Sequence, residues 1–248
     1  MDRLIYVEND YDGRYGKFWG ELGEVIRDRD LYLHRPQDFS LVCFTGGEDV
    51  SPCLYGHKNL GSHNSPRRDD TEQEVYDVAT KWKIPLTGIC RGSQFLNVMM
   101  GGTMVQHLEK GHGGGRHIMQ TTQPDDDIRD MEVTSSHHQM SVLGDGGVLL
   151  GVSEKSIDPD AMVYDGGVEA LFPALDASGN LQTGTHPQTG VPMKHTVSVI
   201  TEAFAYPKAN IFAVQHHPEW QDINGVAPQW VLNMIRTHCF EESMEAAS

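Results

Sequence analysis

The feature that most constrains the fold is a short apolar strand that runs directly into a helix with apolar residues on nearly every side. The strand is predicted over residues 85–89, and the helix begins just after Gly92 and carries Phe95, Leu96 and Val98. Because these side chains point in several directions around the helix axis, the helix must be buried. A buried helix that follows a strand is typical of a parallel sheet covered by helices on both faces.

Further strands and helices are predicted along the chain. Strands are expected over residues 3–7, 39–44 and 211–215, and helices from about 15 to 26 and from about 228 onward. This alternation favours an α/β fold with a mainly parallel sheet, folded as a single domain over residues 1–248.

The most regular helical pattern ends before Pro85. Its apolar face has members spaced i, i+3, i+4 and i+7, namely Val75, Val78, Ala79 and Trp82. Thr71 and Glu74 have the spacing of a capping box, which predicts that the helix begins there.

Residues 143–195 have weak periodicity and many turn-forming segments, including GDGG, YDGG and DASGN. We interpret this stretch as a loop-rich insertion with turns and a hairpin, and not as a second domain. Loop-rich stretches of this length are usually either functional or disordered.

Composition excludes several classes of partner. The 248 residues include 19 basic and 35 acidic side chains, a net charge of −16, which argues against binding to nucleic acid. No apolar run is long enough to span a membrane, and the first residues lack the apolar core of an export signal. The four cysteines form no CxxC pair, so we expect reduced thiols and a cytoplasmic location.

Cys90 lies between two glycines, Gly88 and Gly92, at the predicted junction of strand and helix. One interpretation is a structural cysteine, a buried thiol beside an ordinary turn. The alternative is a nucleophile on a tight turn, like the serine of the G-x-S-x-G elbow, because glycines permit the strained backbone. At this position the helix dipole and the free N–H groups would favour a thiolate.

A base for such a thiolate is available in the segment VQHHPEW, which follows a late strand. Residues i and i+2 of an extended segment share a side, so His217 can pair with Glu219 while His216 points the other way. Gly46-Gly47 follows another strand, and one of their N–H groups, with the N–H of Arg91, could form an oxyanion hole. Because ligands collect at the carboxyl ends of parallel strands, we expect these segments to converge.

These segments also carry a resemblance to a known family. The segment GGEDVSPCLYG (46–56) is similar to the pattern GGxDVxPxxYG, and Arg68, Asp69 and Glu72 match RDxxE. GICRGSQFLNV, GGT, VQHLEKGH, SSHHQ and VQHHPEW follow in the same order. The chain therefore resembles the class I glutamine amidotransferase superfamily, and within it the γ-glutamyl-γ-aminobutyrate hydrolase (peptidase C26) group.

The resemblance implies a flavodoxin-like sandwich in which Cys90, His217 and Glu219 form a catalytic triad. It implies that Cys90 attacks the side-chain amide of a γ-glutamyl compound or of glutamine and forms a γ-glutamyl thioester that water hydrolyses. Gly47 and Arg91 match the oxyanion positions of the family. Gln94 and the backbone around Ser136 and His137 match positions that hold the glutamyl group.

The chain departs from the family pattern between SSHHQ and VQHHPEW, where it is longer. Two segments, DGGVEA (165–170) and ITEAF (200–204), could each match the short family motif before the last strand. The length of this stretch leaves the leaving group of the substrate open.

Three functions are compatible with these residues: a stand-alone γ-glutamyl hydrolase, a glutaminase subunit that supplies ammonia to a separate synthase, and an inactive binding or scaffold protein. A homodimer is also compatible with the sequence. We expect no cofactor and no metal, because the 13 histidines, among them His107, His112, His117, His137 and His138, lack the spacing of known metal motifs. Cys43, Cys53 and Cys239 are interpreted as structural.

Overall fold

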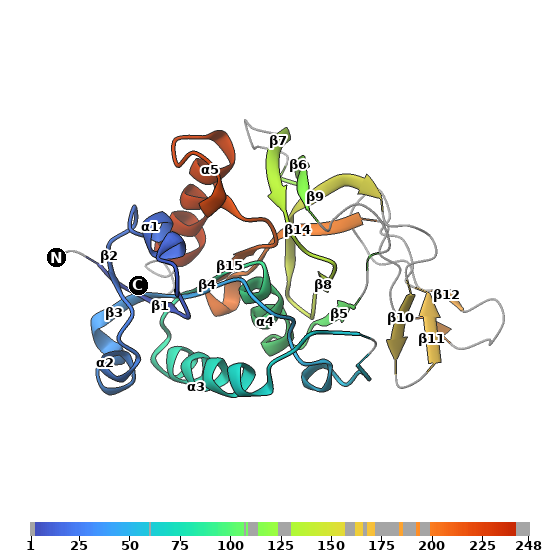
Figure 1. Cartoon of the computed structure of the whole chain (residues 1–248), viewed down its shortest axis with the longest axis horizontal. Coiled ribbons are helices and arrows are strands. Elements are labelled where there is room, and N and C mark those ends of the chain that lie inside the picture. Colours follow the sequence, from blue (N-terminus) through green and yellow to red (C-terminus); the bar gives the residue numbers. More distant parts are fainter. Residues whose placement is uncertain are drawn as a thin grey trace.

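The computed structural model of the protein describes residues 3–59, 61–106, 108, 114–123, 130–156, 162–165, 168–171, 184–185, 192–193 and 199–241. A nine-stranded sheet with the order β2-β1-β3-β4-β15-β14-β9-β6-β7 runs through it (Figure 1). The first five strands of that order are parallel: β2 (Glu24–Ile26), β1 (Leu4–Glu8), β3 (Phe39–Phe44), β4 (Leu86–Ile89) and β15 (Ile211–Val214). The α/β class with a parallel sheet is therefore confirmed.

The other four strands extend this sheet in antiparallel fashion: β14 (Val199–Tyr206), β9 (Val148–Ser156), β6 (Gly115–Thr121) and β7 (Asp130–Ser135). Strand β15 lies at the centre, parallel to β4 on one side and antiparallel to β14 on the other. A small antiparallel pair, β5 (Thr103–Val105) with β8 (Met140–Val142), lies outside this sheet.

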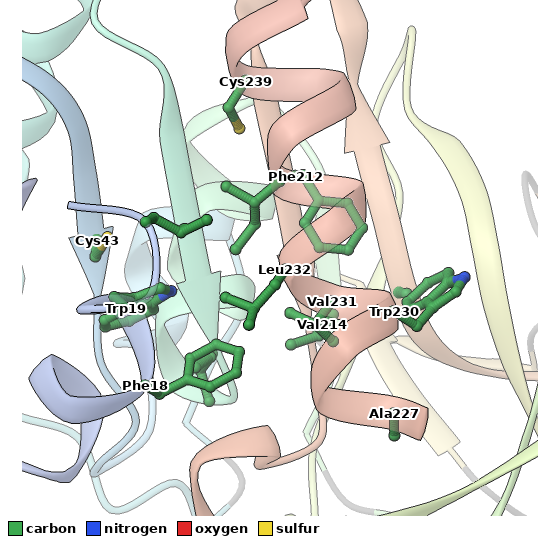
Figure 2. Packing of buried hydrophobic residues seen from close by; sticks show 14 of the residues in the cluster. Phe18, Trp19, Cys43, Phe212, Val214, Ala227, Trp230, Val231, Leu232 and Cys239 are labelled. Atoms are coloured by element: carbon green, nitrogen blue, oxygen red, sulfur yellow. The ribbon is translucent and has the colours of Figure 1, made fainter. Parts of the chain in front are cut away.

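Helices cover both faces of the parallel half because its strands are apolar on both sides. Alternate residues such as Ile5 and Val7 of β1 face one core, which contains α1 (Arg14–Trp19) and α5 (Val226–Ile235) (Figure 2). Tyr6, between them, faces a second core with α2 (Arg29–His34), α3 (Pro66–Trp82) and α4 (Arg91–Met99). Every residue of α4 from 91 to 98 is buried, as its apolar circumference predicts.

The prediction of one helix from about 15 to 26 is wrong. Helix α1 ends at Trp19, and residues 24–26 form the edge strand β2, in which Glu24 lies opposite Leu4. Gly23 allows this pairing, because a side chain there would collide with the backbone carbonyl of Arg3. Sheet pairing thus decides the conformation of a segment whose own pattern is helical.

The predicted start of the long helix is also wrong. Helix α3 begins at Pro66, a residue favoured in the first turn of helices, and Thr71 donates its hydroxyl to the carbonyl of Arg68 within the helix. Trp82, predicted on the apolar face, is 49% exposed because it is the last residue of the helix. The final helix begins at Val226, two residues before the predicted start, and a π-helical turn over Arg236–Glu241 continues it.

The stretch predicted as an insertion contributes more to the sheet than expected. Strand β9 is a full member of the central sheet, while β10 (Met162–Asp165) and β11 (Val168–Leu171) form the expected hairpin. A two-residue pair, β12 (Gly184–Thr185) with β13 (Pro192–Met193), follows. The remainder of 143–195 beyond residue 156 lies outside the described residues. Figure 1 shows the β10–β11 hairpin at the opposite end of the view from the N-terminus.

The structure distinguishes the two segments that could match the motif before the last strand. ITEAF lies in β14, which is hydrogen bonded to the last strand, and the N–H of Gln215 donates to the carbonyl of Glu202 at 2.7 Å. DGGVEA contributes to the separate hairpin. The segment beside the last strand is therefore ITEAF.

Candidate active site

Cys90 occupies the tight turn that the two neighbouring glycines predict. Its backbone has φ 54° and ψ −110°, a conformation that non-glycine residues rarely adopt, at the first turn of α4. A Cβ on Gly88 would lie 2.5 Å from the backbone carbon of Gly92, and one on Gly92 would collide with the carbonyl of Phe44. Both positions therefore require glycine, because any side chain at Gly88 or Gly92 would block the close approach of β4 and α4.

The Cys90 turn is anchored to the last strand. The N–H of Cys90 donates to the carbonyl of Val214 at 2.9 Å, and the hydroxyl of Ser93 donates to the Cys90 carbonyl at 2.7 Å. Val214 is the final residue of β15, so the chain leaving it delivers His217 beside the cysteine. The convergence of these segments at the strand ends agrees with the prediction from the sequence.

His217 and Glu219 lie as the i, i+2 spacing predicts. The Nδ1 atom of His217 is 2.7 Å from Oε1 of Glu219, and the carbonyl of His217 accepts a hydrogen bond from Thr134 at 2.7 Å. Burial alone would lower the pKa of His217, but the charge and hydrogen bond of Cys90 and the carboxylate of Glu219 together raise it to about 10. The arrangement therefore favours an imidazolium beside Cys90.

Two aromatic residues for which the sequence predicts no role complete this site. If Gly46 carried a Cβ, that atom would lie 2.5 Å from the hydroxyl of Tyr15, 3.0 Å from Cε1 of His217 and 3.5 Å from Cβ of Cys90. The Tyr15 hydroxyl is thus part of the site, and burial, followed by the charges of Glu219 and Cys90, raises its pKa and keeps it protonated.

The second aromatic residue is Trp220. Its ring is parallel to the ring of His217, with centroids 3.8 Å apart and an angle of 2° between the planes. Neither this contact nor that of Tyr15 leaves a periodic signal in the sequence, because both depend on how separate segments pack.

The Gly46-Gly47 loop, which is predicted to contribute to the oxyanion hole, is held in place by Arg68. Its guanidinium donates to the carbonyl of Gly46 at 3.0 Å and to that of Thr45 at 3.3 Å. Gly47 has φ 150°, and a Cβ there would collide with the same guanidinium. The backbone N–H groups of Gly47 and Arg91 stay our predicted oxyanion donors.

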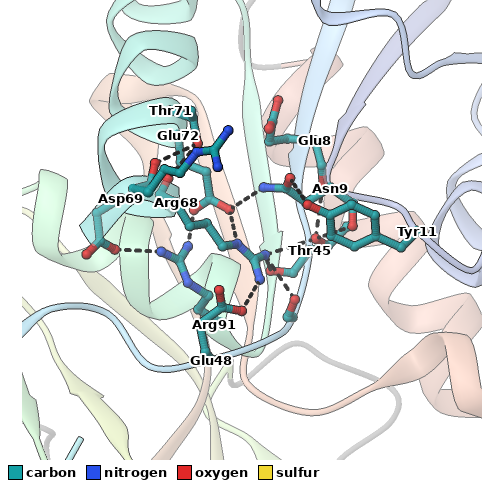
Figure 3. Close-up of polar contacts among 12 residues, drawn as sticks. Glu8, Asn9, Tyr11, Thr45, Glu48, Arg68, Asp69, Thr71, Glu72 and Arg91 are labelled. Carbon is teal, nitrogen blue, oxygen red and sulfur yellow. Dashed lines mark hydrogen bonds and ion pairs between the residues drawn. The ribbon is translucent and has the colours of Figure 1, made fainter. Parts of the chain in front are cut away.

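The RDxxE residues form a charge network with Arg91 and Glu48 (Figure 3), and Arg68 connects it to this loop. Arg91 pairs with Asp69 at 2.6 Å and with Glu72, and its side chain is only 1% exposed. Arg68 pairs with Glu72 at 2.8 Å and with Glu48 at 2.7 Å. Glu72 thus joins both arginines, so Arg68, Asp69 and Glu72 give the site structural support.

The residues predicted to hold the glutamyl group differ in their surroundings. The amide of Gln94 is buried and donates to the carbonyl of Gln139 at 3.3 Å and to Oε1 of Gln215 at 3.1 Å. Ser136 is exposed, whereas the ring of His137 is buried. Since the Gln139 carbonyl can only accept, Nδ1 of His137 donates to it at 2.8 Å.

A buried carboxylate beyond this loop was not anticipated. Glu202 of β14 is fully buried, and its Oε1 lies 2.8 Å from Nε2 of His117 and 3.7 Å from Nε2 of His137. Its Oε2 lies 3.8 Å from Nδ1 of His216, which turns away from His217 as the sequence predicts. Burial would raise the pKa of Glu202, but these imidazoles hold it well below its ordinary value.

Two members of the histidine-rich stretch, His117 and His137, thus lie beside the carboxylate of Glu202. Among the described residues, no group of three or more His, Cys, Asp or Glu side chains has an arrangement that could hold a metal ion. His107 and His112 lie outside the described residues. Of the cysteines interpreted as structural, Cys43 and Cys239 are buried in the core, whereas Cys53 is exposed.

The charge of Glu202 leads to a prediction about acid stability. Glu202→Gln is expected to lower the free energy of unfolding at pH 7 by about 2–4 kcal/mol, since buried histidines lose their charged partner. A lowered carboxyl pKa stabilises the fold above the unfolded value of about 4.3, and the contribution is lost as the pH falls through the folded value. Urea unfolding at several pH values should show the deficit shrinking below about pH 4.3.

Glu154→Gln on the neighbouring strand β9 is the matched control for this prediction, because Glu154 is exposed. It should change stability by less than about 0.5 kcal/mol at any pH. A deficit of Glu202→Gln that stays constant down to acidic pH would contradict the ionised state assigned to Glu202.

The arrangement of strands and helices is also found in solved structures of other proteins. With a TM-score of 0.61 and 15% identity, the chain is similar to a Thermoplasma acidophilum structure described as part of a GMP synthase, over 100% of this chain and 99% of the other. The glutaminase domain of Trypanosoma brucei CTPS with bound acivicin gives a TM-score of 0.54 at 12% identity, over 94% and 92%. The fold is that of a class I glutamine amidotransferase.

The sequence comparison identifies the family. The model of the peptidase C26 family matches residues 34–172, more than half of the chain, so the chain belongs to the peptidase C26 family. That match includes Cys90 and ends before His217. A Schizosaccharomyces pombe protein named as a glutamine amidotransferase is 38% identical over 150 residues, which are 58% of this chain and 53% of that protein. The chain matches at most about half the length of such curated relatives.

No helix among the described residues has both the length and the apolar character needed to cross a membrane.

Proposed function

We propose that the protein hydrolyses γ-glutamyl amide bonds with Cys90 as nucleophile, His217 as general base and acid, and Glu219 as the group that orients His217. The observation that carries this proposal is the strained Cys90 turn beside the buried His217–Glu219 pair, with its 2.7 Å hydrogen bond. A nucleophile, a base and an orienting carboxylate in this order are the elements of nucleophilic amide hydrolysis.

In the proposed reaction, the Cys90 sulfur attacks the γ-carbonyl carbon, and the carbonyl oxygen takes up the negative charge. The N–H groups of Gly47 and Arg91 stabilise that oxyanion. The C–N bond then breaks while the His217 imidazolium gives its proton to the leaving amine or ammonia. Water, deprotonated by His217, attacks the resulting γ-glutamyl thioester, and glutamate and the Cys90 thiolate are released.

Substrate contacts are proposed at the position of Gln94 and along the backbone of Ser136 and His137. The hydrogen bonds of the Gln94 amide to the Gln139 carbonyl and to Gln215 support a fixed wall at that position. We propose a single domain over residues 1–248 that needs no cofactor and acts on a small molecule. The four free cysteines are consistent with the predicted cytoplasmic location.

A second candidate is a glutaminase subunit that supplies ammonia to a synthase on another chain. The fold likeness to structures described as part of a GMP synthase and as the glutaminase domain of CTPS favours it. An inactive scaffold is disfavoured, because a scaffold does not need a strained cysteine beside a histidine–carboxylate pair. A homodimer stays a prediction.

The test is to incubate the purified chain with glutamine, γ-glutamyl-putrescine, γ-glutamyl-γ-aminobutyrate and a γ-glutamyl peptide, and to measure glutamate release and the intact mass. Release from one amide together with an acyl adduct on Cys90 would support the hydrolase. If none of the four compounds releases glutamate, while a glutamine-mimicking electrophile still alkylates Cys90, the glutaminase subunit would be favoured. An inert Cys90 would contradict both.

The two neighbouring histidines give a further prediction. His217→Asn is expected to lower kcat by about three to four orders of magnitude, because it removes the proposed base. His216→Asn is expected to change kcat by less than about tenfold, since His216 faces Glu202 and not Cys90. Steady-state kinetics of both variants decide the matter, and the reverse order would show that the base is wrongly assigned.

A further inference from the structure

The indole of Trp220 covers one face of the His217 ring, and the mechanism above gives it no role. The two planes are parallel within 2° at a centroid distance of 3.8 Å, which is van der Waals contact over the whole imidazole. His217 is buried, while Trp220 is 44% exposed. The indole thus forms part of the boundary between the catalytic histidine and solvent.

The edges of His217 are occupied by groups of other elements. Glu219 contacts Nδ1, Cys90 provides a second hydrogen bond, and the Tyr15 hydroxyl lies nearby across Gly46. His216 is a further titratable group close to the ring, but burial lowers its pKa and keeps it neutral. The indole of Trp220 therefore contacts the flat face of the His217 imidazole. In this arrangement the π electrons of the indole attract a positively charged imidazolium.

We propose that Trp220 is a positioning residue that stabilises the imidazolium form of His217 by a cation–π stack. The proposal rests on the proposed function, in which His217 carries a proton after Cys90 has become a thiolate and gives it to the leaving group. Tryptophan is the aromatic residue with the strongest attraction for a cation, and a phenyl ring would retain only part of the effect.

Two effects of the indole have opposite signs, which makes the proposal testable. If Trp220 acts mainly by shielding His217 from water, its removal hydrates the imidazolium and raises the pKa of His217. If it acts as a cation–π partner, its removal lowers that pKa by about 0.5 to 1 unit. The sign of the shift distinguishes the two.

The experiment follows the titration of the His217 ring by NMR in a Cys90→Ala chain, which avoids the coupled titration of thiol and imidazole. The His217 signal is assigned by its loss in His217→Asn. The variants Trp220→Leu and Trp220→Phe are compared with Trp82→Leu, a matched control because Trp82 is 49% exposed and lies at the end of α3. Glu219→Gln is a positive control, which must lower the midpoint.

We expect Trp220→Leu to lower the midpoint by about 0.5 to 1 unit, Trp220→Phe to lower it by less, and Trp82→Leu to leave it unchanged. A midpoint in Trp220→Leu that equals that of Trp82→Leu, or one that is higher, would overturn the proposal. If Trp220→Leu does not fold, the phenylalanine variant decides by the same sign.

The titration needs no substrate, so its outcome is independent of the proposed function. A protein that hydrolyses no γ-glutamyl compound can still show the Trp220-dependent midpoint, and an active hydrolase can lack it. In the active chain, Trp220→Leu should also move the basic limb of the kcat/KM profile to lower pH, and Trp82→Leu should not.

Discussion

Replacing Cys90 with alanine is expected to abolish turnover of every γ-glutamyl substrate, with a loss of about four orders of magnitude or more in kcat. The reason is that the thioester cannot form without the sulfur, and the hydroxyl of Ser93 in the first turn of α4 already donates to the Cys90 carbonyl. Alanine keeps a Cβ at this position, so the backbone strain at φ 54° and the fold should not change. Glutamate release and intact-mass spectrometry measure the loss of activity and of the acyl adduct.

Cys53→Ala is the matched control, because Cys53 is an exposed cysteine on a different element, the short helix Pro52–Tyr55. It should retain full activity and the adduct. Circular dichroism and thermal unfolding of Cys90→Ala must match those of the parent. Turnover that survives in a folded Cys90→Ala protein would exclude the thioester mechanism.

Replacing Glu72 with alanine is expected to lower the free energy of unfolding by about 3–5 kcal/mol. Glu72 is fully buried and pairs with both Arg68 and Arg91, so its loss leaves two buried guanidinium groups short of a partner. Because Arg68 also holds the carbonyls of Thr45 and Gly46, the glycine loop beside Cys90 should loosen as well. Chemical denaturation at pH 7 gives the stability.

The same helix offers a control for this prediction. Glu74→Ala removes the pair with Arg29, whose side chains are 59% and 30% exposed, and should cost no more than about 1 kcal/mol. Equal losses for the two variants would mean that the buried network does not contribute more than a surface ion pair.

The parts of the fold that were predicted correctly are those with local causes. Strands β1, β3, β4 and β15 are short apolar runs, and burial on both faces of a parallel sheet requires such runs. The Cys90 turn is also local, since Gly88 and Gly92 are the two residues that the close approach of β4 and α4 demands.

The parts that were missed depend on contacts between distant segments. Strand β2 forms because Glu24 meets β1, and β9 forms because β14 lies beside it. Nothing in the periodicity of either segment indicates a strand. The start of α3 at Pro66 was missed because the capping-box spacing of Thr71 and Glu74 is too short a signal to fix a helix end.

The site shows the same division. Cys90, His217 and Glu219 could be predicted to meet, because strand ends converge at one edge of a parallel sheet. The roles of Tyr15, Trp220 and Glu202 could not be predicted, since they follow from packing. For Glu202 a signal existed in ITEAF, yet only the pairing of β14 with β15 separates it from DGGVEA.

The position of β15 in the sheet has a consequence for how the chain matures. Strand β15 is inserted between β4 and β14, although it follows β4 by more than a hundred residues in the sequence. During synthesis on the ribosome, β4 therefore keeps an unpaired edge until residues 211–214 have emerged, and such edges invite pairing with other chains. The same late segment delivers His217 to Cys90. In the nascent chain, Cys90 thus has no histidine beside it until β15 has paired with β4. Insertion of β15 therefore completes the sheet and the site at the same time.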